Sequence, residues 1–226
     1  MAKGYFVTAT DTGAGKTLIT AGLVEAFTQQ GLRAVALKPV ASGCQHTDEG
    51  LRNEDASYFI QHAPIELDYA QVNPYAFEPP ISPNIAAREA GVEIELPRLL
   101  QIYRDVAAMS DRVLVEGVGG WKVPLSDEVF VSDLAAELGL AVIVVVPLRL
   151  GCINHALLTL ESIAASGVEI AGWVPNMLDR SLTHVPDVID TINRHSAAPA
   201  LGIIPPLQSP LPKVVAQHIT LDLLES

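Results

Sequence analysis

Apolar and polar positions divide the chain into two kinds of segment that alternate. Short runs rich in β-branched residues predict strands, and the segments between them have the period of amphipathic helices. The predicted strands are residues 5–9, 34–38, 112–118, 141–147, 170–176 and 200–204. The predicted helices are residues 16–30, 54–61, 84–89, 96–108, 131–137, 153–166 and 185–194.

Some predicted strands are apolar almost without interruption, most clearly residues 142–146. Strands that are buried on both faces of a parallel sheet have this pattern. Alternating strands and helices therefore predict an α/β fold, with a doubly wound, mainly parallel sheet and helices on both faces. A chain of 226 residues suits one substantial core, so we expect a single domain over residues 1–226.

Residues 63–83 interrupt this alternation of predicted strands and helices. They contain five prolines, at positions 64, 74, 79, 80 and 83, and show little periodicity. A connection of this length is usually either functional or mobile. Neither side of it is long enough to fold alone, so we expect no domain boundary there.

Composition and charge exclude several classes of function. The formal charge of −12 argues against a nucleic-acid binder, because phosphate backbones select basic surfaces. The most apolar run, residues 141–148, is far shorter than the ~20 residues that span a bilayer. Cys44 and Cys152 lack metal-ligand spacing and fit two free thiols in a reducing compartment. We therefore expect a cytoplasmic protein with no membrane or nucleic-acid partner.

Candidate chemistry begins where the first predicted strand ends. In the segment 10–17, Thr-Asp-Thr-Gly-Ala-Gly-Lys-Thr, Gly15-Lys16-Thr17 lies between a strand and an apolar helix. In a P-loop, backbone N–H groups surround phosphates, the lysine reaches the β- and γ-phosphates, and the hydroxyl binds Mg²⁺. Thr10 replaces the glycine of the strict pattern, so the match is to a variant loop. The alternative is a glycine-rich turn with an incidental lysine.

A second lysine and two carboxylates follow other predicted elements. Lys38 ends the second strand, Glu116 lies near the end of the third, and Asp55 opens a helix. Ligands of doubly wound sheets bind beyond the carboxyl ends of the strands, so Lys38 and Glu116 are expected near Lys16. Taken singly, each has a simpler explanation: a surface lysine, a tight Gly117–Gly120 turn after the strand, or an acid that stabilises a helix dipole.

Beyond the phosphate loop, several short strings together resemble the dethiobiotin synthetases, a P-loop family of biotin biosynthesis. These strings are Lys-Pro-Val-Ala-Ser-Gly (38–43), Gly-Leu-Arg-Asn (50–53), Val-Asn-Pro-Tyr (72–75), Leu-Val-Glu-Gly (114–117), Pro-Leu-Ser-Asp (124–127) and Leu-Gly-Cys-Ile-Asn-His-Ala (150–156). The resemblance runs from the amino terminus to about residue 176 and continues more loosely beyond it.

The resemblance implies an ATP- and Mg²⁺-dependent ligase that forms C–N bonds. Its substrate 7,8-diaminononanoate takes up CO₂ or bicarbonate as a carbamate, which attacks the γ-phosphate of ATP. The neighbouring amine then closes the carbamic–phosphoric anhydride to a ureido ring, releasing ADP and phosphate. Two lysines and a cation aimed at the phosphoryl and carbamate oxygens would stabilise the charge that develops there.

By resemblance, Lys16 and Lys38 are the catalytic residues, and Thr17, Asp55 and Glu116 hold Mg²⁺. The implied nucleotide-binding residues are Gly13, Ala14, Gly15, Lys16, Thr17, Leu18, Asp55, Glu116, Gly117, Val118, Gly119, Asn176, Pro205, Pro206 and Leu207. The implied substrate-binding residues are Thr12, Lys38, Ser42, Gly119, Gly151, Cys152, Ile153 and Asn154.

The last four of these residues imply a homodimer. In the family, a helix start of this sequence binds the remote carboxylate of the substrate from the other subunit, so each site is shared between two chains. Asn176 is implied to read adenine, yet residues 176–179, Asn-Met-Leu-Asp, also fit an Asn-x-x-Asp guanine pattern. Ala9, Gly13 and Met177 depart from the family's usual residues.

The main alternative is a P-loop ATPase switch of the partitioning or septum-positioning type. Such switches carry a signature lysine five residues before the P-loop lysine, where this chain has Asp11. Amidating synthases of the cobyrinate type share the fold but carry a glutaminase domain, for which 226 residues leave no room. The pattern of residues therefore favours the synthetase.

Overall fold

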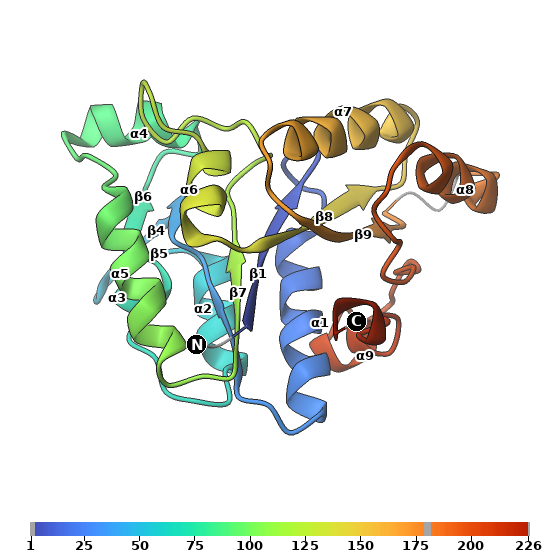
Figure 1. Cartoon of the computed structure of the whole chain (residues 1–226). Helices are drawn as coiled ribbons and strands as arrows, with labels where there is room; N and C mark the ends of the chain where they lie inside the picture. Colours follow the sequence, from blue (N-terminus) through green and yellow to red (C-terminus); the bar gives the residue numbers. More distant parts are fainter. Residues whose placement is uncertain (1–2, 179–181, 226) are drawn as a thin grey trace.

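A five-stranded parallel sheet forms the centre of the protein, seen here in a computed structural model that describes residues 3–178 and 182–225 (Figure 1). Its strand order is β2-β7-β1-β8-β9. The bounds are β1 Lys3–Ala9, β2 Ala34–Leu37, β7 Arg112–Glu116, β8 Ala141–Pro147 and β9 Ile170–Asn176. Every neighbouring pair is parallel, as the apolar runs predicted.

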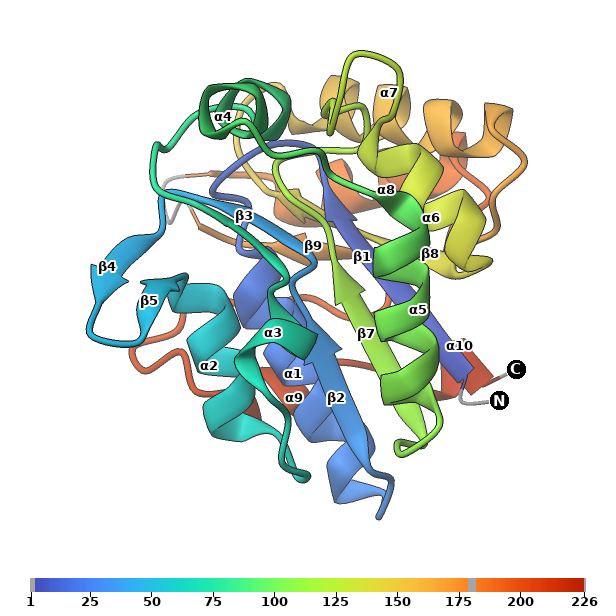
Figure 2. The ribbon, with the colours of Figure 1, turned by 90° about the vertical axis from the view of Figure 1, so that its left-hand side faces the viewer.

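Helices cover both faces of this sheet (Figure 2). On one face lie α1 (Lys16–Gln29), α2 (Glu54–His62) and α9 (Pro212–Ala216). On the other lie α5 (Leu96–Ala107), α6 (Val131–Leu138) and α7 (Cys152–Ala165), with α8 (Val185–His195) packed on α7. The doubly wound α/β class is therefore confirmed. The shorter helices are α3 (Tyr69–Val72), α4 (Pro83–Ala90) and α10 (Asp222–Glu225).

The core lies between the sheet and these two helix layers. In β8, every side chain from Val142 to Val146 is fully buried, which removes a continuous apolar run from water and stabilises the centre of the sheet. Tyr5 of β1 stacks on Phe27 of α1 with ring centroids 6.1 Å apart. This contact fixes α1 against the strand from which the phosphate loop emerges.

Four short strands were missed by the pattern of hydrophobic residues. β3 (Val40–Ser42) pairs with β6 (Tyr75–Phe77), and β4 (Gln45–Thr47) forms an antiparallel hairpin with β5 (Gly50–Arg52). The expected break at residues 63–83 in fact contains α3 and β6. Elements of three or four residues are too short for either period to show.

The predicted strand at residues 200–204 is wrong. Ala200 and Ile204 make only single bridges to β9, at Trp173 and Asn176. Pro199 and Pro205 cannot donate backbone hydrogen bonds, and Gly202 between them has φ +134°, outside the range of a regular strand. The segment bonds to the edge of the sheet at these two points and does not form a continuous strand.

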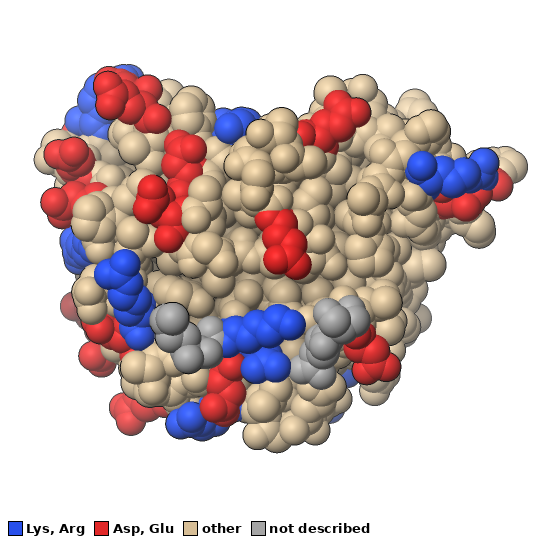
Figure 3. Space-filling view, viewed as in Figure 1, with Lys and Arg blue, Asp and Glu red and all other residues tan. Residues whose placement is uncertain are grey.

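Figure 3 shows acidic and basic side chains scattered over this face, many of them near its rim and some near its middle. Within the part of the chain that the structure describes, no helix is both long and apolar enough to cross a membrane. Cys44 and Cys152 are both buried and form no disulfide.

Candidate active site

A cavity of about 570 Å³ opens at the carboxyl ends of β1, β2 and β7. Half of the predicted site residues line it, although they come from four separate stretches of the chain. These residues are Thr12, Gly13, Gly15, Lys16, Thr17, Lys38, Ser42, Asp55, Glu116, Val118 and Gly119. The parallel sheet brings them together because its strands all end at the same edge.

The phosphate loop joins β1 to the start of α1. Gly15 has φ +91°, a left-handed conformation that other residues rarely adopt, and an added Cβ would collide with the amide of Asn176. That amide donates a 2.8 Å hydrogen bond to the carbonyl of Ala14. The loop is therefore held from the end of β9, with the free N–H groups of α1 available to an anion.

Lys16 is buried at the start of α1. Its Nζ donates a 2.7 Å hydrogen bond to the carbonyl of Gly119, on the turn after β7. Burial, and then repulsion from Lys38, lower the pKa of Lys16 to about 8. Phosphate oxygens in the cavity would offset both effects, because an anion next to an ammonium favours its charged form.

Lys38 lies between two carboxylates. Its Nζ donates to Asp55 Oδ2 at 2.9 Å and to Glu116 Oε1. Burial alone would lower the pKa of Lys38, but attraction to Glu116 and Asp55 outweighs it and holds the pKa above its usual value. The ammonium is therefore charged and fixed in place.

Glu116, at the end of β7, makes a second contact within the site. Its Oε1 accepts a 3.1 Å hydrogen bond from the hydroxyl of Thr17. Its Oε2 is buried and has no hydrogen-bond partner among the described residues. A buried carboxylate oxygen without a partner is costly, so this atom suits a ligand that supplies positive charge.

Asp55 is placed by the start of α2. The side chain of Asn53 caps this helix by accepting from the Ala56 N–H at 3.3 Å, which puts Asp55 in the first turn. Burial tends to raise the pKa of Asp55, but attraction to Lys38 and the hydrogen bond from Lys38 lower it overall. Asp55 and Glu116 are thus both oriented by the same lysine.

Sequence reasoning missed several residues that line this cavity. They are Ala41, Asn53, Pro80, Ile81, Ser82, Pro83 and Val123. The four residues 80–83 belong to the proline-rich connection, and its unusual length was a signal that could have identified them. Asn53 could have been found as the cap residue before a predicted helix.

The remaining predicted residues lie around the cavity or away from it. Ala14, Leu18 and Gly117 adjoin lining residues in the chain, and residues 205–207 follow the point at which Ile204 bridges to Asn176. Residues 151–154 form the start of α7 and do not line this cavity in a single chain. Asp179, part of the guanine pattern, lies outside the described residues.

The loop, its lysine and the doubly wound sheet define a P-loop nucleotide-binding protein. A family model described as an AAA domain matches residues 3–212. Among solved structures, the MinD cell division protein of Aquifex aeolicus superposes with a TM-score of 0.61 at 16% identity, covering 99% of this chain and 96% of that one. A cobyrinic acid a,c-diamide synthase from Mycobacterium smegmatis with bound ADP and magnesium gives 0.59 at 18% identity, covering 96% and 92%. These likenesses show the fold alone.

Sequence relatives identify the family. The ATP-dependent dethiobiotin synthetase BioD of Pseudomonas paraeruginosa is 50% identical over 218 residues, 96% of each chain. That of Marinobacter nauticus is 41% identical over 223 residues, 96% of this chain and 95% of its own. This chain belongs to the ATP-dependent dethiobiotin synthetases, which are ligases. The predicted family is confirmed, and the alternative of an ATPase switch is not favoured.

Proposed function

We propose that this chain carboxylates 7,8-diaminononanoate with CO₂ and closes the ureido ring of dethiobiotin, using ATP. The observation that carries the proposal is the position of Lys38. It is a buried, charged lysine held by two carboxylates, in the same cavity as the phosphate-loop lysine. A simple nucleotide-binding site needs only Lys16, whereas a reaction between a carbamate and a phosphoryl group needs positive charge at both reactants.

The reaction steps are those that the family implies, and the two lysines are placed to assist them. A carbamate oxygen forms a bond to the γ-phosphorus as the bond from that phosphorus to the ADP oxygen breaks. The second amine nitrogen then bonds to the carbamate carbon, phosphate leaves, and the amine loses a proton. Lys16 neutralises the phosphate oxygens, and Lys38 neutralises the carbamate and the transferred phosphoryl group. Thr12, Ser42 and Gly119 line the cavity where the diamine would lie.

The residues of the site fit Mg²⁺. The hydroxyl of Thr17 and the carboxylates of Asp55 and Glu116 are hard oxygen donors, and Glu116 Oε2 is buried without a partner. Among the described residues, no group of three His, Cys, Asp or Glu side chains could bind a metal alone. This suits Mg²⁺, which is commonly bound by one or two carboxylates together with substrate phosphates and water. The bound ion would neutralise phosphate charge.

Other parts of the proposal rest on the family. We propose that residues 1–226 act as one domain in a cytoplasmic homodimer, and that Gly151, Cys152, Ile153 and Asn154 bind the substrate carboxylate across the interface. Gly151 caps α7, and the first N–H groups of a helix have no acceptor within the helix, which supports this role. Asn176, with Pro205, Pro206 and Leu207 beside it, is proposed to contact adenine.

Phosphate release tests the function directly. Purified protein is incubated with ATP, Mg²⁺ and bicarbonate, with and without 7,8-diaminononanoate, and dethiobiotin is detected by mass spectrometry. Release of phosphate that depends on the diamine, with an equal amount of dethiobiotin, is expected. Release that ignores the diamine would overturn the assignment.

A further inference from the structure

Two of the strings that carry the family resemblance, residues 50–53 and 72–75, meet at one tyrosine. The hydroxyl of Tyr69 accepts a hydrogen bond from the Asn53 backbone N–H at 2.7 Å. The same hydroxyl donates to Asn73 Oδ1 at 2.9 Å. Tyr69 thus joins the start of α2 to the segment that follows α3, and both Asn53 and Asn73 are buried.

The chain of hydrogen bonds ends at Lys38. The amide of Asn73 donates to the Lys38 carbonyl at 2.7 Å, and the Lys38 backbone N–H donates to the Val72 carbonyl at 2.8 Å. β2 is an edge strand, and its last paired residue is Leu37, opposite Val115. Lys38 therefore lies past the end of the sheet ladder, and residues 72–73 hold its backbone in place of a neighbouring strand.

The other end of the chain of hydrogen bonds reaches Asp55. Asn53 is the cap residue of α2, and Asp55 lies in the first turn of this helix. Arg52 covers the ring of Tyr69 with its guanidinium 4.1 Å from the ring centroid, an arrangement that is attractive in itself. Tyr69 is thereby fixed on its ring as well as at its hydroxyl.

We propose that Tyr69 and Asn73 are positioning residues that set Lys38 and Asp55 relative to each other. Neither touches the cavity. Tyr69 fixes the helix start that carries Asp55, and Asn73 fixes the backbone that carries Lys38, so the 2.9 Å contact between Lys38 and Asp55 exists before substrates bind. Preorganisation of this kind lowers the cost of reaching the reactive geometry. The kinetic part of this proposal rests on the proposed function.

The test compares Tyr69→Phe with Tyr58→Phe. Tyr58 is on α2, and its hydroxyl makes no hydrogen bond within the described part of the chain, so it is a matched control. Three quantities are measured for each variant: kcat with KM for ATP, calorimetric binding of Mg²⁺-ADP, and Tm. We expect Tyr69→Phe to lower kcat by about tenfold and to weaken Mg²⁺-ADP binding by about threefold, since both hydrogen bonds of the Tyr69 hydroxyl are lost. Tyr58→Phe should change neither.

Asn73→Leu separates the two halves of the proposal. Leucine has a similar shape but cannot donate to the Lys38 carbonyl, whereas the bond from Asn53 to Tyr69 remains. We expect kcat to fall by about tenfold and Mg²⁺-ADP binding to stay within about twofold of the unmodified protein. If the Asn73→Leu protein does not fold, the measurements on Tyr69→Phe decide whether the proposal is correct.

A purely structural role would give a different result. If Tyr69→Phe lowers Tm but leaves kcat and Mg²⁺-ADP binding unchanged, the positioning role is wrong. Failure of the proposed function would look different again, because the unmodified protein would then show no diamine-dependent phosphate release. In that case Mg²⁺-ADP binding still decides whether Tyr69 positions Asp55.

Discussion

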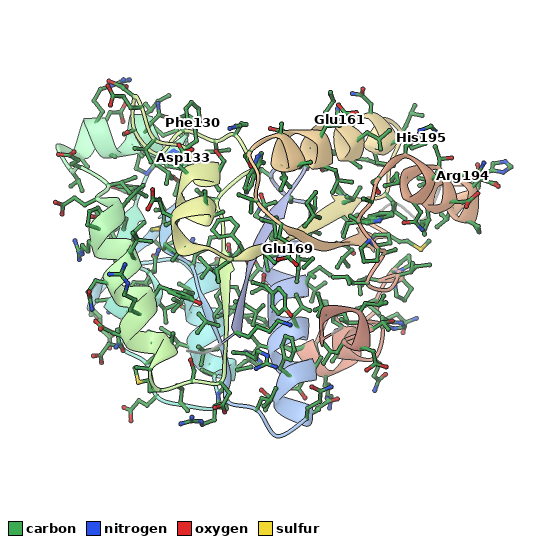
Figure 4. All side chains as sticks on the ribbon, viewed as in Figure 1. Phe130, Asp133, Glu161, Glu169, Arg194 and His195 are labelled. Atoms are coloured by element: carbon green, nitrogen blue, oxygen red, sulfur yellow. The ribbon has the colours of Figure 1, made fainter. Side chains whose placement is uncertain are left out.

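A cavity lies at each end of the parallel strands, at their amino ends (the amino edge) and at their carboxyl ends (the carboxyl edge). The cavity at the amino edge is the larger of these two, about 740 Å³ against about 570 Å³. Apolar and aromatic residues such as Tyr103 and Leu140 line much of the amino-edge cavity. Two of its polar groups bond to the backbone, since Lys3 Nζ and the Tyr5 hydroxyl both donate to the Leu224 carbonyl. Glu169, labelled in Figure 4, lines its rim. At the carboxyl edge, Lys16, Lys38 and Glu116 are all buried.

This comparison shows that buried charged side chains, and not cavity volume, identify the active site. Removing an ion from water costs several kcal/mol even after the protein relaxes, so two lysines and a glutamate are buried only where a role compensates for that cost. An apolar hollow costs much less and forms wherever short elements pack imperfectly. Single substitutions at the carboxyl edge should therefore lower the activity of the enzyme. Single substitutions at the amino edge should chiefly lower the stability of the fold.

The largest expected effect is loss of activity at either buried lysine. Lys16→Gln and Lys38→Gln should each lower kcat by about a hundredfold or more, because each removes a charge aimed at the transition state. Lys16 contacts phosphates in the ground state as well, so its loss should also weaken ATP binding, whereas ATP affinity should largely survive in Lys38→Gln. Steady-state kinetics with equilibrium ATP binding checks both expectations.

Lys3→Gln at the amino edge is the control for these variants. It removes the same charge from the same type of residue, and Lys3 lies at the opposite end of β1 from the phosphate loop. Its turnover should match that of the unmodified protein. Normal turnover in Lys38→Gln would mean that the second lysine has no part in the reaction.

Subunit mixing tests whether the carboxyl edge is completed by a second chain. Lys38→Gln and Gly151→Glu should each be nearly inactive, the second because its new carboxylate repels that of the substrate. In a mixed dimer with shared sites, one site carries both lesions and the other carries neither. Activity should therefore recover toward about a quarter of normal, since half of the dimers are mixed and each has one intact site. Proven subunit exchange without recovery would show that each chain builds its own site.

Carboxylate substitutions should have a smaller effect that depends on metal. Asp55→Asn and Glu116→Gln should each raise the Mg²⁺ concentration for half-maximal activity by about tenfold, because each weakens a hard oxygen donor. Excess Mg²⁺ should restore part of the rate. Glu161→Gln, on the exposed surface of α7, is the control. Unchanged Mg²⁺ titrations for both Asp55→Asn and Glu116→Gln would show that these carboxylates do not coordinate the metal ion.

The residues at the carboxyl ends of the strands could be predicted from the sequence, whereas the residues that hold them in place could not, for a physical reason. The sheet strands have long apolar runs, and residues at their ends, such as Lys38 and Glu116, are placed by topology alone. Tyr69 and Asn73 act through single hydrogen bonds between segments that are remote from each other in the chain, and no periodicity reports such contacts. The short helix and strands around them are stabilised by tertiary packing, which propensity does not show.

The smallest expected effect is at the amino edge, where Arg33 and Asp111 join the starts of β2 and β7. Arg33 donates to Asp111 from its backbone N–H at 2.8 Å and from its guanidinium at 2.9 and 3.0 Å. Hydrogen bonds from Arg33 hold the pKa of Asp111 at about 2. Since this pKa is depressed in the folded state, the stabilisation is present above the unfolded-state pKa of about 4 and is lost as the pH falls through about 2.

The Arg33–Asp111 pair is exposed to solvent, so Asp111→Asn should lower Tm by only a few degrees at pH 7 and leave kcat unchanged. The Tm difference from the unmodified protein should shrink between about pH 4 and pH 2. A difference that stays constant over this range would show that the loss comes from packing and not from the charge, and a fall in kcat at pH 7 would contradict the division between the two edges.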